Sequence, residues 1–265
     1  MPLLLSPWPW LSFVFCLVVH FALERGAKLP YATAFKIGRG VASVGMTAIG
    51  FYALVRYAAL LPRCYVAHQA DDAIAHALVL VIIGHFVADF ALVAYGLRAR
   101  VRARPDLVIH HALGLFAAAM LLRLGAGHAL YLSLFTTEMM PVTTAVGALG
   151  VALGRPAWER TAQALRMAVL LVWRIPLWLV IAYLVWKNLD AGAPDATLRA
   201  VYLFSASFLV VTLSLDSFWT YKSWKALRHK APVTQALRRA LVVLLALPFA
   251  TPARADISIP SPRAK

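Results

Sequence analysis

Two adjacent histidines near the start of an apolar segment are the first residues in this chain whose chemistry stands out. The segment covers residues 106–124 and carries His110 and His111 about one turn inside its start. Asp106 follows Pro105 and can cap a helix there by accepting a free backbone N–H. The helix dipole favours neutral imidazole at this end, and neutral imidazole serves as a general base, a nucleophile or a metal ligand. Neighbouring helical residues are about 100° apart, so at most one histidine need face a bundle interior.

Other apolar segments also contain ionisable residues. His85 and Asp89 are four residues apart and therefore share one face of a helix. Glu138, Arg174 and Asp216 each lie in a later segment. A charge in hydrocarbon costs several kcal/mol unless it is paired or hydrated. Such groups in five segments predict a polar pocket inside a helix bundle.

Each of these groups also has a structural interpretation. The adjacent histidines could anchor a helix at a solvated interface, and His85 with Asp89 could form a buried pair. Glu138 and Arg174 could form a salt bridge between helices, whereas Asp216 could be solvated near a segment end. We favour function for the histidines because polar groups inside membrane helices are commonly functional.

Two prolines lie beside the buried charges, Pro141 after Glu138 and Pro176 after Arg174. Proline inside a helix removes a backbone hydrogen bond and kinks the helix. Broken helices at membrane depth usually line cavities. Asp89 and the histidines lie closer to the predicted inner ends of their segments, so we expect a pocket open to the cytoplasm.

The composition is that of a membrane protein. The chain has 265 residues, of which 62% are hydrophobic and 14% charged, and its net charge is +15. This charge lies in short loops, where it sets topology and attracts lipid headgroups, so no nucleic-acid partner is expected. Cys16 and Cys64 have no metal-ligand spacing, and no metal centre is expected. The bias towards Ala, Leu and Arg favours a bacterial inner membrane, with the endoplasmic reticulum as the eukaryotic alternative.

Seven apolar segments are long enough to cross a bilayer as helices. No basic residue precedes the first, as one would in a signal peptide, so we expect an uncleaved helix. The sequence predicts an all-α bundle of about seven transmembrane helices. The segments are residues 3–23, 41–61, 73–97, 106–124, 128–149, 163–186 and 198–221.

Along the chain, loops rich in basic residues alternate with loops that have few of them. The positive-inside rule therefore predicts that the N-terminus lies outside and the C-terminus in the cytoplasm. The predicted outer loops carry only Arg63, Arg123, Lys187 and Arg199. The predicted inner loops carry Arg25, Lys28, Lys36, Arg39, Arg98, Arg100, Arg102, Arg104, Arg155, Arg160, Arg166, Lys222, Lys225, Arg228 and Lys230.

These patterns divide the chain into three parts. Residues 1–35 form a first helix and a basic loop, and residues 36–230 form a six-helix membrane domain. Residues 231–265 form a basic tail whose apolar stretch is too short to span a membrane.

The order of these polar residues over about residues 36–230 resembles the TLC-domain family of multi-span proteins that handle lipids. In the ceramide synthases of this family, paired histidines are required for acyl transfer from acyl-CoA to an amine. The glutamate followed by proline is closer to the TLCD branch than to the ceramide synthases proper. The residues that carry the resemblance are Asp89, His110, His111, Glu138 with Pro141, Arg174 with Pro176, and Asp216 with Trp219.

The leading hypothesis is a lipid acyltransferase that uses acyl-CoA, or acyl carrier protein, as co-substrate and holds no bound cofactor. His110 or His111 would act as base or nucleophile, and Asp89 would orient a histidine. The residues expected to bind substrate are His85, Glu138, Arg174, Asp216, Arg98, Arg100, Arg102 and Arg104.

Two other functions remain open at this stage. A lipid-binding or membrane-composition protein without catalysis would use the same pocket. A haem protein would use His85 and His110 as ligands from facing helices. The expected partners are membrane lipids and the acyl donor, with self-association into a homodimer also considered.

Overall fold

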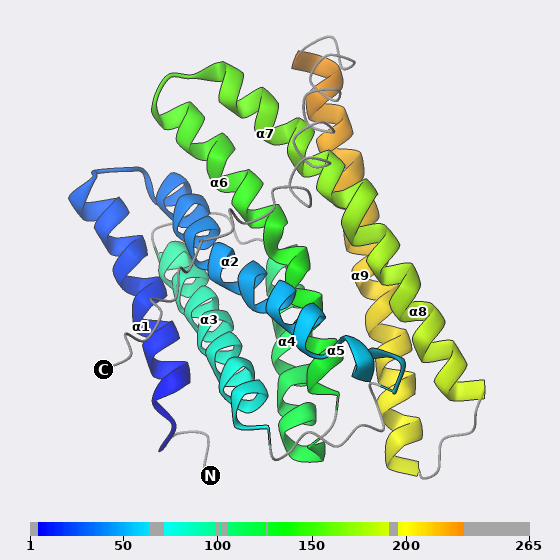
Figure 1. Ribbon diagram of the computed structural model, residues 1–265. Helices are drawn as coiled ribbons and strands as arrows, with labels where there is room; N and C mark the ends of the chain where they lie inside the picture. Colours follow the sequence, from blue (N-terminus) through cyan, green and yellow to red (C-terminus); the bar gives the residue numbers. More distant parts are fainter. Residues whose placement is uncertain are drawn as a thin grey trace, which may run out of the picture.

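The computed structural model describes residues 5–63, 72–98, 101, 105–125, 127–190 and 196–230, and these residues contain no strand (Figure 1). Seven helical spans are long and apolar enough to cross a membrane, so the predicted all-α polytopic bundle is confirmed. Cys64 and the tail 231–265 lie outside the described residues. The spans are Pro7–Gly26, Tyr31–Arg56, Ala73–Arg98, Pro105–Leu124, His128–Ala152, Pro156–Lys187 and Val201–Arg228.

Several spans contain short irregular turns between regular helices. Segments η2 and η5 are π-helical, whereas η3 and η4 are 3₁₀ turns. In chain order the elements are α1 (Pro7–Phe21), η2 (Ala22–Gly26), α2 (Tyr31–Arg56), η3 (Ala58–Arg63), α3 (Ala73–Arg98), α4 (Pro105–Leu124), α5 (His128–Leu134), η4 (Phe135–Glu138), α6 (Met139–Ala152), α7 (Pro156–Ala168), η5 (Val169–Arg174), α8 (Ile175–Asp190) and α9 (Ala196–Lys230).

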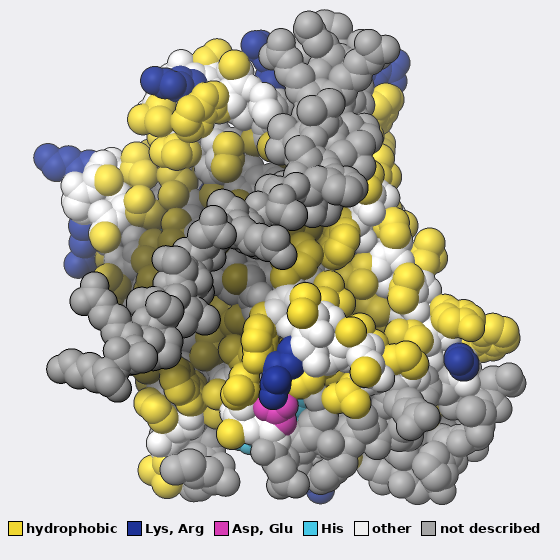
Figure 2. Space-filling model, viewed as in Figure 1, with side chains coloured by type: hydrophobic (Ala, Val, Ile, Leu, Met, Phe, Trp, Pro, Cys, Tyr) yellow, Lys and Arg dark blue, Asp and Glu magenta, His cyan; other side chains and the backbone are white. Residues whose placement is uncertain are grey.

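The two ends of the bundle differ strongly in charge. The end of α1, the α6–α7 turn and the end of α9 lie together at the top of Figure 1. Basic side chains lie along this edge, whereas hydrophobic side chains cover much of the face below it (Figure 2). We call this the basic end. By their positions in the helices, the basic residues of this end are Arg25, Lys28, Lys36, Arg39, Arg98, Arg155, Arg160, Arg166, Lys222, Lys225, Arg228 and Lys230, against Arg56, Arg63, Arg123, Lys187 and Arg199 towards the other end.

Two helices start earlier than the uncharged stretches indicated. Helix α2 begins at Tyr31 rather than at residue 41, so Lys36 and Arg39 lie within the helix and not in a loop. The sixth span begins at Pro156 rather than at residue 163. Hydropathy marks only the part of a helix that lies in hydrocarbon, and long basic side chains can extend from its ends towards water.

Helix α2 packs closely against α6 and η4, which carries Glu138. A Cβ atom at Gly50 would overlap the backbone of Phe135 and Thr136, and one at Gly40 would overlap the side chain of Ala145. Helices in lipid associate through close packing of small residues, because no water is expelled between them. Gly50 therefore brings α2 against the turn that holds Glu138, and Gly40 brings α2 against α6.

The start of α3 is fixed by Asp72. One carboxylate oxygen accepts the backbone N–H of Ala75 at 2.9 Å, and the other accepts the hydroxyl of Tyr57 at 2.8 Å. Burial and the hydrogen bond to Asp72 raise the pKa of Tyr57 to about 12. Partial burial acts to raise the pKa of Asp72, but the hydrogen bonds from Ala75 and Tyr57 outweigh it and the pKa is lowered.

We expect Gly50→Ala to destabilise the protein by about 1–3 kcal/mol, because the added methyl group displaces the backbone of η4. Thermal unfolding of the purified protein in detergent measures this. Gly45→Ala is the matched control, since a Cβ at Gly45 meets no atom within 4 Å. Equal melting temperatures for the two variants would contradict the proposed close packing.

Asp72→Ala should cost about 1 kcal/mol at neutral pH through loss of the helix cap. The folded-state pKa of Asp72 is depressed, so its stabilisation is complete above the unfolded value of about 3.9 and declines as the pH falls through the folded value. The difference in melting temperature between Asp72→Ala and wild type should therefore shrink as the pH falls below about 3.9. Tyr57→Phe, which keeps the cap, is the control. A difference that stays constant with pH would disprove the ionised cap.

Candidate functional site

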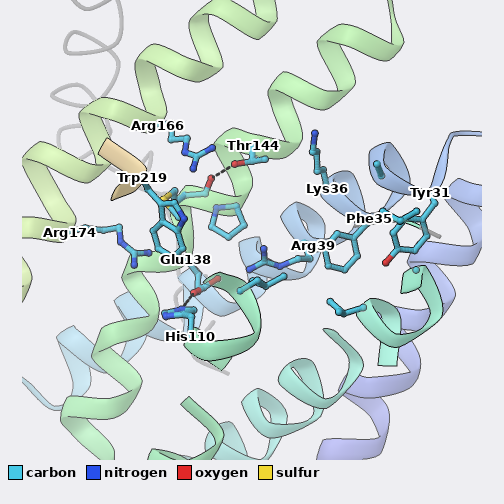
Figure 3. A pocket seen from close by; sticks show the side chains of 17 residues that line it. Tyr31, Phe35, Lys36, Arg39, His110, Glu138, Thr144, Arg166, Arg174 and Trp219 are labelled. Carbon is cyan, nitrogen blue, oxygen red and sulfur yellow. Dashed lines mark hydrogen bonds and ion pairs between the residues drawn. The ribbon is translucent and has the colours of Figure 1, made fainter. Parts of the chain in front are cut away.

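A cavity of about 120 Å³ lies between the helices in the half of the bundle nearer the basic end (Figure 3). We call it the main pocket. Its wall combines aromatic and aliphatic side chains with a small number of charged groups, as is common in ligand pockets. It is lined by Tyr31, Ala32, Phe35, Lys36, Arg39, Val93, Gly96, Val101, Leu107, His110, Glu138, Met140, Pro141, Thr144, Arg166, Arg174 and Trp219.

His110 and Glu138 form a carboxylate–imidazole dyad on the pocket wall (Figure 3). His110 Nε2 lies 3.7 Å from Glu138 Oε1, and the His110 side chain keeps 13% of its surface exposed. The other carboxylate oxygen accepts the hydroxyl of Ser43 at 3.4 Å. A carboxylate beside imidazole orients the ring and stabilises its protonated form, which suits a general base.

His111 belongs to a second cluster, in which His111 and Asp89 are buried and Arg39 reaches the main pocket. Its Nδ1 lies 3.4 Å from Asp89 Oδ2, and its Nε2 lies 3.4 Å from Arg39 Nη2. Arg39 Nε also contacts Asp89 Oδ2 at 2.7 Å. Both ring nitrogens of His111 are thus engaged, and its side chain is only 1% exposed. His111 therefore positions Arg39 and does not line the main pocket.

The structure revises the roles predicted for the histidine region. Both histidines face the interior, although at most one need have done so. Asp89 contacts His111 and not the pocket-facing His110, whose carboxylate partner is Glu138. His85 is buried away from the main pocket, with its Nδ1 3.5 Å from Cys16 Sγ. A direct role of His85 in binding substrate is therefore not supported.

Arg174 and Asp216 form a buried ion pair between the sixth and seventh spans. Arg174 Nε donates to Asp216 Oδ2 at 2.9 Å, and the indole of Trp178 donates to the same oxygen at 2.8 Å. Arg174 and Asp216 are 1% and 0% exposed. The alternative of a solvated Asp216 is thus wrong, and so is a direct Glu138–Arg174 salt bridge, because Glu138 pairs with His110. Asp216 does not line the main pocket.

The proline after Glu138 explains a further contact of Arg174. Pro141 has no N–H to donate to the carbonyl four residues earlier, which belongs to Thr137. Arg174 Nη1 donates to that carbonyl at 2.9 Å. At the two positions where kinks were expected, the structure has a 3₁₀ turn before Pro141 and a π-helical turn before Pro176. Such irregular turns are frequent at functional sites.

Trp219 connects the last span to the start of α4. Its indole N–H donates to Asp106 Oδ2 at 3.0 Å, so Asp106 lies in the first turn of α4 with this oxygen directed to α9. The Trp219 ring lies 6.0 Å from the His110 ring and 5.5 Å from the Arg174 guanidinium carbon. It therefore closes the wall of the main pocket beside the dyad.

The cations near the main pocket differ from those the sequence suggested. Arg98 is exposed and does not line this pocket, and Arg100, Arg102 and Arg104 lie outside the described residues. Lys36, Arg39 and Arg166 line it instead. The sequence does contain a signal for these two residues. Lys36 and Arg39 lie three residues apart and follow Pro30 closely, which suits the first turns of a helix.

Within the described ranges, no group of three or more His, Cys, Asp or Glu residues is placed to hold a metal ion. No protein-family model matches the chain, and comparisons with curated proteins and with solved structures also give no match.

We expect Arg174→Met to destabilise the protein by about 3–5 kcal/mol, because it leaves a buried Asp216 carboxylate without its cation. The double variant Arg174→Met, Asp216→Leu should recover much of this loss, since the uncompensated charge is removed. Thermal unfolding in detergent measures both. Arg123→Met, at an exposed site near the end of α4, is the control. A double variant as unstable as the single one would contradict this account.

Proposed function

We propose that this integral membrane protein is a lipid acyltransferase that transfers an acyl chain from a thioester to a lipid amine or hydroxyl. The observation that carries the proposal is the His110–Glu138 dyad on the wall of a pocket between membrane helices. The dyad supplies a base, and the apolar wall suits an acyl chain. Membership of the TLC-domain family, on the resemblance described above, is part of the same proposal.

In the proposed reaction His110 removes a proton from the acceptor as the acceptor attacks the thioester carbonyl. The new bond from nitrogen or oxygen to carbon forms, the carbon–sulfur bond breaks, and the thiolate leaves with the proton returned by His110. Glu138 would stabilise the imidazolium formed between these steps, since it lies 3.7 Å from the ring. Attack by His110 itself on the thioester, giving an acyl-imidazole, is the second route open to this dyad.

The neighbouring groups support this use of the pocket. Arg39 lines the pocket and is held by Asp89 and His111, so its position is fixed before a ligand arrives. A fixed guanidinium can stabilise negative charge on a carbonyl oxygen in the transition state. Phe35, Leu107 and Met140 supply an apolar wall. We place the basic end in the cytoplasm by the positive-inside rule, where thioester donors are available.

Lipid binding without catalysis is the alternative, and the same pocket favours it. Its apolar wall and fixed charges would hold a lipid whether or not His110 acts as a base. The two functions differ in the effect of replacing His110. Loss of the base abolishes turnover in an acyltransferase, whereas a binding protein retains its lipid.

The test is untargeted lipidomics on cells that express wild type or His110→Ala at equal levels. We expect one lipid class to rise with wild type only and the increase to fall at least about a hundredfold in the variant, as for loss of a general base. Glu138→Gln should lower the increase less. His111→Ala is the contrasting variant: its main effect should be a lower melting temperature, because it disrupts the buried Asp89–Arg39 cluster.

Equal lipid shifts with wild type and His110→Ala would reject catalysis and favour the binding function. Purified His110→Ala protein must melt at the wild-type temperature for the comparison to count, and the partial exposure of this side chain makes that the expected result.

A further inference from the structure

A second cavity of about 410 Å³ adjoins the main pocket at the basic end. The two cavities share Lys36, Thr144, Arg166 and Trp219, so they lie side by side. We call the second cavity the basic groove. Besides the shared residues, its lining includes Glu159, Lys222 and Ser223.

The charge of the basic groove is positive. Lys36, Arg166 and Lys222 come from three different helices, α2, α7 and α9, and only Glu159 opposes them among the lining residues. The lining therefore carries three formal positive charges and one negative, a net charge of +2. Three separate helices holding cations around one space match a dianionic ligand better than a single carboxylate.

Ser223 provides independent evidence for a ligand. It lines the basic groove, its side chain is 1% exposed, and its Oγ is buried without a hydrogen-bond partner among the described residues. A buried hydroxyl without a partner costs about 1–3 kcal/mol, and such groups in native proteins call for an explanation. A ligand oxygen in the groove would accept this hydroxyl's hydrogen bond.

We propose that the basic groove binds a phosphate ester, and that this phosphate belongs to the molecule whose acyl chain occupies the main pocket. The inference rests on the proposed function for the occupant of the main pocket. Because the two cavities adjoin, one ligand would span both, with its chain among apolar helices and its phosphate at the basic end. Two sources carry this chemistry, a phospholipid headgroup and the phosphates of a carrier thioester.

The experiment measures ligand binding to the purified full chain at low salt, without turnover. The test variant is Arg166→Gln, Lys222→Gln. The matched control is Arg160→Gln, Lys225→Gln, which removes the same charge from the same two helices at exposed positions outside both cavities. Two pairs of probes are used: palmitoyl-CoA with palmitoyl-pantetheine, and lysophosphatidic acid with monoacylglycerol. The second member of each pair lacks the phosphate groups.

We expect the test variant to raise the Kd of a phosphate-bearing probe at least about tenfold and to leave that of its phosphate-free partner unchanged. The control variant should change neither. The probe pair in which this difference appears identifies the source of the phosphate. Ser223→Ala should raise the Kd of the same phosphate-bearing probe by a smaller factor.

The proposal would be overturned if the test and control variants weakened binding of the phosphate-bearing probe equally. It would also be overturned if the test variant weakened binding of the phosphate-free probe as much as that of its phosphate-bearing partner. The result is separate from the proposed catalysis, because binding is measured without reaction. A protein that binds the phosphate through the groove, yet gives the same lipids with His110→Ala as with wild type, keeps this inference and loses only the acyltransferase function.

Discussion

The buried guanidinium of Arg174 connects three of the membrane spans. It pairs with Asp216 on α9 and bonds the Thr137 carbonyl in η4. In hydrocarbon a charge of this kind must find such partners within the protein. The sixth span is thereby fixed against the fifth and seventh, and the position of η4 determines where Glu138 lies. The dyad thus depends on an ion pair that takes no part in the proposed chemistry.

The adjacent histidines divide two tasks that a single residue could not combine. His111 is enclosed by Asp89 and Arg39, and this fixes the rotation of α4 about its axis. His110, about 100° further round, then faces the pocket and Glu138. The buried histidine supplies order, and the partly exposed one is the base in the proposed reaction.

The sequence was sufficient to predict what hydropathy and charge determine. It identified seven spans, the charge difference between the loops, and the buried residues that deserve a role. It did not predict which side chains pair. A salt bridge between Glu138 and Arg174 is one interpretation of the sequence, but Glu138 ends a 3₁₀ turn and pairs with His110 on α4. Arg174 instead donates one of its hydrogen bonds to the Thr137 carbonyl. Such pairing depends on helix rotation and on local departures from regular helix, which a residue list does not encode. Hydropathy alone places Lys36 and Arg39 in a loop, because uncharged stretches mark the part of a helix in hydrocarbon and not the whole helix.

The adjacency of the main pocket and the basic groove has a consequence for membrane asymmetry. Both cavities lie in one half of the bundle, and the groove sits at the charged end. A two-part ligand would enter and leave with its polar head at a single face of the bilayer. Its head would never cross the hydrocarbon, so any lipid made or held here would stay in the leaflet from which it came. A protein of this shape would alter one side of a membrane and leave the other to separate transbilayer transport.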